Sequence, residues 1–320
     1  MAQKQKTLAK QIIRYKNRQE WLDARNGGIG ASEVATVLGL NPFETPYQLW
    51  RRKKGLDAPK QENFAMKAGH YLEDAVARFY ADATQCHIIK NTAEDFSIIN
   101  PDKPFLRVSP DRLYWRDGMK HNEENKCVLE CKITQMEIDE DSVPQHWFCQ
   151  LQMNMGVAEL PQGALAWLTM GRKFGFRDFM FDKEFYTWMI GEVEKFWRDN
   201  IIGKQEPTAQ SAQDVLLKYN RHTDGKIVEV GEDIYVSCLE MQEIKERIEE
   251  MEEQKSETEA KIKIAFADAE AISYGGKIIA TWKAPKPSSK FDAKAFQAAH
   301  PDLAREFIVP TQGARRLVIK

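Results

Sequence analysis

The eight residues VLECKITQ, 128–135, combine an apolar run with two charged side chains. Side chains of a β-strand alternate between the two faces of a sheet, so Glu130 and Lys132 share one face. Leu129 and Ile133 point to the other face, where we expect a core. A carboxylate beside an ammonium is tolerable at a strand end when the charges are paired, hydrated or bound to a metal. Taken alone, the pattern also fits an exposed ion pair.

A second carboxylate precedes this stretch at a spacing that fits a β-hairpin. Asp111 lies in the alternating segment FLRVSPDRLYW, nineteen residues before Glu130. If the two strands pair, these carboxylates come side by side. Together with the main-chain carbonyl of Cys131 and water, they form an oxygen-rich site that suits Mg²⁺ better than zinc. Lys132 could orient or help deprotonate a water whose pKa the metal lowers, which is the chemistry of phosphodiester hydrolysis.

The bulk composition limits the class of protein. The chain has 320 residues, 42% of them hydrophobic and 29% charged, with a net charge of −2. No apolar run approaches the roughly 18 residues that span a bilayer, and the N-terminus lacks the apolar region of a signal peptide. The five cysteines form no C-x-x-C pair, which disfavours a disulfide framework, a zinc ribbon or an iron–sulfur cluster. We expect a cytoplasmic protein with no membrane partner.

Charge is distributed unevenly along the chain. Residues 1–19 carry six basic side chains and no acid, RRKK at 51–54 forms a second basic cluster, and 232–260 holds eleven acids. Most such runs are solvated faces. Two basic clusters on a weakly acidic chain nevertheless permit a local phosphate-binding surface.

The order of helical and strand-like patterns predicts an α/β (α+β) fold. A composition break near 203–209 divides the chain into a domain at 1–205 and an extension at 206–320. Helical patterns occupy 5–20, 32–38, 45–55, 63–84, 144–160, the later part of 177–202, and 234–269. Strand patterns occupy 87–92, 96–101, 105–115, 127–134, 164–170, the start of 177–202, a hairpin at 273–284, and 315–320.

Four blocks in order resemble the YqaJ-type phage recombinases, a lambda-exonuclease-like branch of the PD-(D/E)xK nuclease superfamily. The blocks are RNGGIGASEVATVLGLNPF, KAGHYLEDAVARFY, FLRVSPDRLYW with VLECKI, and WFCQLQMNMGV. The resemblance covers roughly residues 20–200. It implies a restriction-endonuclease-like core with a mixed central sheet flanked by helices. The C-terminal helical arm and small β element lie outside it.

The resemblance also implies roles for individual residues. Asp111, Glu130 and Glu73 match metal ligands, Lys132 matches the catalytic lysine, and Gln150 matches a glutamine near the attacking water and the scissile phosphate. The neighbour of Glu73, Asp74, is expected to face water.

The resemblance does not assign roles to two residues near Gln150. Gln152 is expected to be a surface amide. Trp147, one helical turn before Gln150, packs either beside the active site or in the core.

A phosphate pocket is implied by the first and third blocks. A Gly-rich turn enters a helix at Ser32, where backbone N–H groups can bind an anion, and Arg25 adds a bidentate phosphate partner. In the family, this arginine, this serine and Ser109 receive a 5′-phosphate, although Ser32 could also simply cap its helix. Met66 stands where the family has an apolar wedge that parts the strands at a duplex end; a core position is the alternative.

The function that the resemblance implies is a Mg²⁺-dependent 5′→3′ exonuclease on the ends of linear double-stranded DNA, with Mn²⁺ substituting. Such an enzyme leaves 3′ single-stranded tails for phage-type recombination by strand annealing. A ring-shaped homotrimer, a separate single-strand annealing protein and the cytoplasm of a bacterial host carrying a phage or prophage gene belong to the same expectation. The alternatives are an endonuclease of the same fold and a non-catalytic recombination or assembly factor.

The acidic helix at 234–269 has no counterpart in the resemblance. Its sparse apolar stripe of Ile244, Ile248, Met251, Ile262 and Phe266 is too irregular to predict a coiled coil. The helix is either an arm that docks a partner or stabilises an oligomer, or a solvated helix covering a small C-terminal domain.

Overall fold

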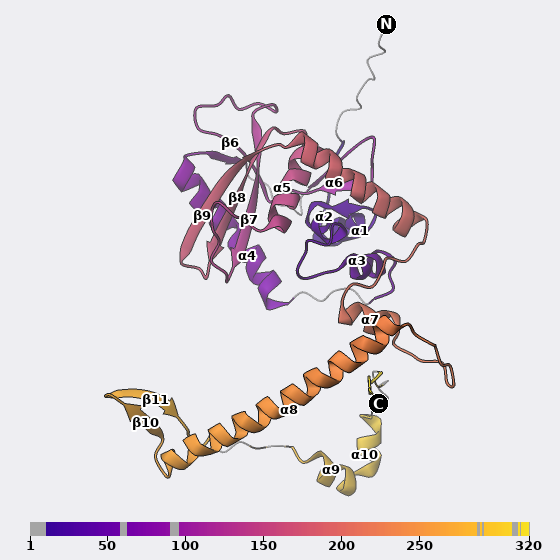
Figure 1. Ribbon diagram of the computed structural model, residues 1–320. Helices are drawn as coiled ribbons and strands as arrows, with labels where there is room; N and C mark the ends of the chain where they lie inside the picture. Colours follow the sequence, from indigo (N-terminus) through magenta and orange to yellow (C-terminus); the bar gives the residue numbers. More distant parts are fainter. Residues whose placement is uncertain are drawn as a thin grey trace. The chain divides into compact units, whose positions relative to one another are not determined.

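The computed structural model describes residues 11–57, 63–89, 96–286, 289, 291–308, 313 and 315–319 (Figure 1). The chain divides into two compact units between Lys218 and Tyr219. The first unit runs past residue 205 and includes α7 (Ala212–Lys218). The buried carboxylate of Asp214 on α7 accepts a hydrogen bond from Thr45, and this contact ties α7 to the first unit.

The first unit is an α/β structure with two sheets. Its helices are α1 (Arg18–Asn26), α2 (Ala31–Val37), α3 (Pro46–Lys53), α4 (Phe64–Thr84), α5 (Gln145–Ala158), α6 (Lys183–Phe196), the π-helical turn η1 (Trp197–Ile202), and α7. Its strands are β1 (Gln11–Arg14), β2 (Ile29–Gly30), β3 (His87–Ile89), β4 (Phe96–Ile99), β5 (Leu106–Val108), β6 (Arg112–Trp115), β7 (Lys126–Thr134), β8 (Gln162–Thr169) and β9 (Lys173–Met180).

The larger sheet has the order β3-β6-β7-β8-β9 and is mixed, because β7 and β8 run parallel whereas the other neighbours are antiparallel. Helices α4 and α5 cover its opposite faces (Figure 1). Leu129 of β7 packs with Val76 and Tyr80 of α4, whereas Val128 packs with the core on the α5 side. The alternation predicted for β7 is therefore confirmed, and so is the predicted α/β fold with a mixed central sheet flanked by helices.

The smaller sheet has the order β1-β4-β5-β2 and contacts α5 through β4 and β5. Helix α5 therefore contacts both sheets, and its apolar residues join Ile98 and Leu106 in one core. The segment predicted as one strand at 105–115 is divided into β5 and β6, which belong to different sheets. Pro110 explains the break, because proline has no N–H to continue a strand ladder.

Two other predictions about the chain ends were wrong. The helix predicted at 5–20 is contradicted by β1, which pairs antiparallel with β4; residues 5–10 lie outside the described residues. The β-branched pair Ile12 and Ile13 suits this edge strand, and Asn17 then caps α1 by accepting a hydrogen bond from the N–H of Glu20. The strand predicted at 315–320 is absent from 315–319, which have no regular secondary structure.

The second unit contains one long helix and small elements: α8 (Glu232–Phe266), β10 (Ala271–Tyr274), β11 (Lys277–Thr281), α9 (Ala293–Ala299) and α10 (Pro301–Glu306). Strands β10 and β11 form the predicted hairpin. Gly275 and Gly276 both have positive φ angles, of 57° and 78°, as a tight hairpin turn requires. Among the described helices of both units, none is long and apolar enough to cross a membrane.

Candidate active site

The β6–β7 hairpin brings Asp111 next to Glu130. Arg112 is paired with Leu129, so the residue before Arg112 lies opposite the residue after Leu129. The carboxylate Oδ2 of Asp111 accepts a hydrogen bond of 2.8 Å from the backbone N–H of Cys131. The hairpin expected from the sequence is therefore confirmed, and this hydrogen bond fixes the Asp111 carboxylate against β7 at the end of the hairpin away from its turn.

Glu130 is completely buried and faces α5 rather than solvent. Its Oε2 lies 3.1 Å from the ammonium of Lys132 and accepts a hydrogen bond from the amide of Gln150. Its Oε1 accepts a hydrogen bond from the amide of Asn154, one helical turn further along α5. Lys132 in turn donates a 2.9 Å hydrogen bond to Oε1 of Gln150. An exposed surface ion pair, the alternative for this Glu-x-Lys pattern, is excluded by this burial.

Glu73 approaches the same place from α4. Its Oε1 lies 2.5 Å from the guanidinium of Arg112, whose side chain is 7% exposed. Asp74 is 56% exposed and pairs at 2.6 Å with Arg78, so it faces water as predicted. Helix α4 thus turns one of two adjacent carboxylates inward, and Arg112 links it to the β6–β7 hairpin.

Burial and like charge shift the acidity of these groups. Burial, reinforced by the neighbouring Asp111 carboxylate, raises the pKa of Glu130 to about 8. The same two causes raise the pKa of Glu73 to about 7. Burial alone would lower the pKa of Lys132, but the adjacent carboxylates of Glu130 and Asp111 outweigh it and raise that pKa. Lys132 is therefore held in its charged form.

These side chains fit a hard divalent cation by their chemistry. Among the described residues, no group of three or more His, Cys, Asp or Glu side chains has converged as a ready-made metal site. Two of the carboxylates are instead paired with cationic side chains: Glu73 forms a salt bridge with Arg112, and Glu130 forms one with Lys132. Three carboxyl groups nevertheless face only two cations, and burial together with mutual repulsion raises the pKa values of Glu130 and Glu73. An all-oxygen donor set with excess negative charge suits Mg²⁺ or Mn²⁺.

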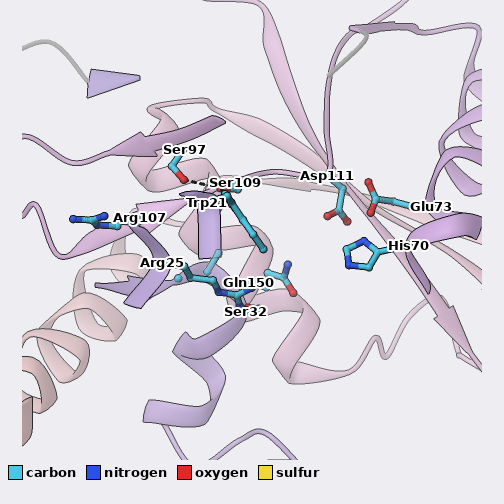
Figure 2. A pocket seen from close by; sticks show the side chains of 12 residues that line it. Trp21, Arg25, Ser32, His70, Glu73, Ser97, Arg107, Ser109, Asp111 and Gln150 are labelled. Carbon is cyan, nitrogen blue, oxygen red and sulfur yellow. Dashed lines mark hydrogen bonds between the residues drawn. The ribbon is translucent and has the colours of Figure 1, made fainter. Parts of the chain in front are cut away.

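A pocket of about 180 Å³ connects these carboxylates to the predicted phosphate-binding residues. It is lined by Trp21, Arg25, Gly30, Ala31, Ser32, His70, Glu73, Ser97, Arg107, Ser109, Asp111 and Gln150. Figure 2 shows Asp111, Glu73 and His70 gathered to one side, and Ser97, Ser109 and Arg25 to the other. Residues from four separate blocks of the sequence thus share one cavity. Lys132 and Glu130 adjoin it through Gln150.

The phosphate side of the pocket is organised by hydrogen bonds. Arg25 donates to the hydroxyl of Ser32, and its guanidinium lies 5.2 Å from the ring centroid of Trp21. Trp21 donates from Nε1 to the hydroxyl of Ser109 at 3.2 Å, and Ser109 lies 2.9 Å from the hydroxyl of Ser97. Arginine and hydroxyl groups held in this way can donate to phosphate oxygens.

Ser32 is the second residue of α2 and not its N-cap, which is Gly30. The N–H of Gly30 donates a hydrogen bond of 2.9 Å to the carboxylate of Glu33, so this carboxylate partly occupies the helix terminus that the sequence predicted as an anion site.

The constraint at Gly28 is steric: a Cβ there would lie 2.4 Å from the carbonyl oxygen of Phe105. Glycine is therefore required where this turn passes β5.

The RRKK cluster does not form a phosphate-binding surface. Lys53 is nearly fully buried and lies 2.8 Å from Glu33, which Arg52 also contacts at 2.9 Å. Arg51 pairs with Asp57 at 2.8 Å. Lys54 donates to the carbonyl of Ile201. The cluster therefore fastens α3 to its surroundings.

Burial alone would raise the pKa of Glu33, but Lys53, Arg25 and Arg52 outweigh it and lower that pKa to about 2. This carboxylate stays charged at neutral pH inside the protein, at the base of the turn that carries Arg25.

Three further predictions have definite outcomes in the geometry. Gln152 is not a surface amide: it is fully buried, donates to the carbonyl of Met180 and accepts from the N–H of Asp182. Trp147 packs in the core near Trp167, with ring centroids 6.3 Å apart. Met66 is 40% exposed on α4, so it is not a core residue, and it is not among the residues that line the pocket.

Sequence reasoning missed several members of the site. Asn154 lies four residues after Gln150, so helical spacing puts both on one face and could have identified it. Arg107 lies two residues before Ser109 on an extended segment, which is a similar signal. Trp21 and Ser97 carry no comparable pattern and required the fold.

Residues 20–161 match the family model described as the YqaJ-like viral recombinase domain. This chain carries a YqaJ-like viral recombinase domain. Every residue lining the pocket lies within the matched range of the YqaJ-like domain, as do Glu130, Lys132 and Asn154.

Relatives of the whole chain and of its fold were also found. The YqaJ protein of Bacillus subtilis (strain 168), described as uncharacterized, is 29% identical over 298 residues, which is 90% of this chain and 89% of that protein. An alkaline exonuclease from Laribacter hongkongensis superposes with a TM-score of 0.45 at 17% identity, over 58% of this chain and 93% of that one. A phage related exonuclease from Haemophilus somnus 129PT gives a TM-score of 0.39 at 10% identity, over 56% and 96%.

Proposed function

We propose that the chain is a Mg²⁺-dependent 5′→3′ exonuclease that degrades one strand from the ends of linear double-stranded DNA. The 3′ single-stranded tail that it leaves would serve phage-type homologous recombination by strand annealing. One observation carries the proposal: a single pocket is lined both by Arg25 and Ser109, which can bind a phosphate, and by Glu73 and Asp111, which can bind a metal. An enzyme that must hold a terminal phosphate while it hydrolyses a nearby phosphodiester requires this combination.

Arg25, Ser32 and Ser109 would hold the terminal 5′-phosphate. A guanidinium offers two parallel N–H donors to phosphate, and the hydroxyls can donate beside it. Trp21 supports this role, since it stacks under Arg25 and donates to Ser109. Binding the end of a 5′-strand in this way is what distinguishes an exonuclease from an enzyme that cuts within a duplex.

Asp111, Glu130 and Glu73, with the main-chain carbonyl of Cys131, would hold Mg²⁺, and Mn²⁺ is expected to substitute. When bound, the metal supplies Lewis-acid stabilisation of charge and lowers the pKa of a coordinated water. Lys132 and Gln150 would orient the nucleophile, and their mutual hydrogen bond of 2.9 Å supports a shared task. The amide of Gln150 also lines the pocket, so it can contact the scissile phosphate.

The remaining parts of the proposal follow from the resemblance to YqaJ-type recombinases. Met66, exposed on α4, would part the strands at the duplex end. A homotrimer would encircle DNA, and a separate single-strand annealing protein would receive the 3′ tail. The site of action would be the cytoplasm of a bacterial host that carries the phage or prophage gene.

The deciding experiment compares substrates that differ only in their ends. Purified protein with Mg²⁺ is incubated with linear duplexes that have or lack a 5′-phosphate and with a closed circle, alongside a sample containing EDTA. We expect Mg²⁺-dependent release of 5′-mononucleotides from the phosphorylated linear duplex and none from the circle. Equal cleavage of circle and linear DNA would instead assign an endonuclease. If no substrate is cleaved with either Mg²⁺ or Mn²⁺, the result would favour the alternative of a non-catalytic recombination or assembly factor.

A further inference from the structure

Helix α8 presents an apolar stripe that nothing covers in the described part of the second unit. Met241, Ile244, Ile248, Met251 and Ile262 are between 40% and 64% exposed. Apart from Ala260, they are the only apolar residues between positions 240 and 263. Within this segment of α8 the apolar residues therefore form one stripe, and a partner that removed it from water would stabilise the helix.

The stripe follows a heptad. Met241, Ile248 and Ile262 occupy a positions, with Lys255 at the a position between them, and Ile244 and Met251 occupy d positions. Their b, c and f neighbours from 242 to 257 are all polar.

Phe266 lies at an e position, outside the a and d positions, and its place in the structure explains why. It is 3% exposed and packs against Trp282 of the hairpin unit, with ring centroids 5.9 Å apart. Phe266 therefore belongs to the contact at the end of α8 and not to the stripe. Without it, apolar residues fill both the a and d positions of two heptads, 241–254, and Lys255 and Thr258 occupy these positions in the third.

The surface along the seam is hollowed where a knob from another helix would enter. A cavity of about 500 Å³ is lined by Ile244, Arg247, Ile248, Met251, Glu252 and Lys255. These are a, d, e and g positions, which form the holes of a coiled coil.

We propose that α8 pairs with α8 of a second copy of this chain as a two-stranded, parallel, in-register coiled coil. Charge complementarity selects this occupant. In a parallel pair, each g residue faces the following e residue of the other strand. Glu240 then faces Lys245 of the second copy, and Arg247 faces Glu252 of the second copy, so both pairs attract.

Antiparallel pairing satisfies either the core or the charges, but not both. The register that sets Ile244 against Ile248 of the second copy brings Arg247 against Arg247 and Lys245 against Lys245. Shifting by one heptad removes these repulsions but sets Ile244 against Lys255. The parallel register sets apolar residues of the two copies against each other from Met241 to Met251 and makes both charged g–e pairs attractive, with Lys255 facing Lys255 beyond them.

Lys255 at an a position accounts for the strand number. A lysine there can extend its ammonium to solvent from a two-stranded seam, whereas a third strand would enclose it. The pairing does not rest on nuclease activity, so the two proposals stand or fall separately.

The first test is the mass of the full chain in solution, measured by sedimentation velocity over a range of concentrations. Ile248→Lys places a charge in the seam, and we expect the wild-type assembly to contain twice as many chains as this variant. Ile264→Lys is the matched control, because Ile264 is 78% exposed and lies at a c position outside the seam. Equal masses for wild type and Ile248→Lys would overturn the proposal, and a threefold ratio would overturn its two-stranded form.

The second test addresses direction. Arg247→Glu and Glu252→Arg should each weaken self-association by roughly three-fold or more, since each creates two repulsive pairs worth a few tenths of a kcal/mol apiece. The combined Arg247→Glu/Glu252→Arg chain should recover it. Failure of the double variant to recover would contradict the parallel register, because only there do these two residues face each other.

A third test does not depend on disrupting the helix. Under mild oxidation, Thr258→Cys at a d position should form a covalent dimer of the full chain, whereas Ser256→Cys on the outer face should not. Wild type is the reference for any contribution from Cys238, which is half-buried. Equal cross-linking of both variants would count against the seam.

Discussion

Asn154 donates a hydrogen bond from its side-chain amide to Oε1 of Glu130, and neither side chain has any exposed surface. The contact leaves Oε2 of Glu130 to Lys132 and Gln150. The amide oxygen of Asn154 has no hydrogen-bond partner among the described residues. The contribution of Asn154 is therefore its N–H donor, which fixes the orientation of the Glu130 carboxylate.

Replacing Asn154 should therefore affect stability in a pH-dependent way. Asn154→Ala removes one donor to a buried carboxyl, and we expect the free energy of unfolding to fall by about 1–3 kcal/mol in urea denaturation. Asn154→Asp sets two carboxyls against each other, so its loss should be larger at pH 8.5 than at pH 5.5, where they can share a proton. An Asn154→Asp loss independent of pH would contradict the contact. Asn125→Ala, in an exposed loop, is the control.

Lys132→Ala should lower the rate of DNA cleavage at least about 100-fold, the usual scale for losing a group that positions or transfers a proton. Its ammonium bridges Glu130 and Gln150, so alanine removes the link between carboxylate and amide. Lys173→Ala on the exposed face of β9 should cleave like wild type. Wild-type rates in a correctly folded Lys132→Ala protein would remove Lys132 from the mechanism.

Arg25→Ala should discriminate between DNA ends. Losing a charge-assisted contact to phosphate is worth about 1.5–3 kcal/mol, so cleavage of 5′-phosphorylated ends should fall roughly 10- to 150-fold, with little change for 5′-hydroxyl ends. Arg25→Lys should lie between, since it keeps the charge but loses the two-pronged geometry. Arg198→Ala, at an exposed arginine of η1, is the control. An identical loss on both kinds of end would reject the phosphate pocket.

Divalent metal and pH should be coupled in the thermal stability. The folded-state pKa values of Glu130 and Glu73, about 8 and about 7, lie above the ordinary value of 4.5. Their contribution to stability is fully present below pH 4.5 and is lost as the pH rises through 7 to 8, because ionisation is then less favourable in the folded state. The metal-free protein should accordingly have a lower Tm at pH 9 than at pH 6.

Mg²⁺ binds the ionised carboxylates, so the rise in Tm that it produces should be larger at pH 9. The Glu73→Gln/Glu130→Gln protein should lose most of this difference. A rise of the same size at both pH values in the wild-type protein would show that Mg²⁺ binds elsewhere.

Lys53→Met should destabilise the fold by about 3–5 kcal/mol, because it leaves the buried carboxylate of Glu33 with one partner fewer. The Glu33→Gln/Lys53→Met protein should recover part of this loss, since it removes both charges together. Lys67→Met, on exposed α4, should cost less than about 0.5 kcal/mol. Urea denaturation of the four proteins measures these differences. A Lys53→Met protein as stable as wild type would contradict a structural role for this lysine.

Much of the fold was predictable because its signals are local. Alternation in the stretch around Glu130 defined β7, helical spacing defined α4, and the gap to Asp111 was short enough for a hairpin. The relation between Asp111 and Glu130 therefore followed from two strands and one loop. Gln150 was assigned from the resemblance to YqaJ-type recombinases, and the helix predicted to carry it is α5.

The predictions were wrong where contacts between residues far apart in the sequence determine the structure. Nothing local distinguishes Gln152 from a surface amide, yet the backbone of the β9–α6 connection satisfies both ends of its side chain. RRKK has the composition of a phosphate-binding patch, but Lys53 is directed inward by Glu33, which is twenty residues away. Gln11–Arg14 became a strand because β4 offers it an edge. In each case the structure is determined by the residues that the segment contacts elsewhere in the chain, and the sequence of the segment alone does not identify them.

Pro110 has a consequence for the size of the product. It separates β5 from β6, and the three consecutive residues Ser109, Pro110 and Asp111 directly connect the phosphate side of the pocket to its carboxylate side. Under the proposed function, the interval between the anchored strand end and the bond to be cut would then be set by a fixed length of covalent backbone with a rigid ring at its centre. Such a segment acts as a molecular ruler, and inserting one residue into it should change the length of the released fragment before it changes affinity for the end.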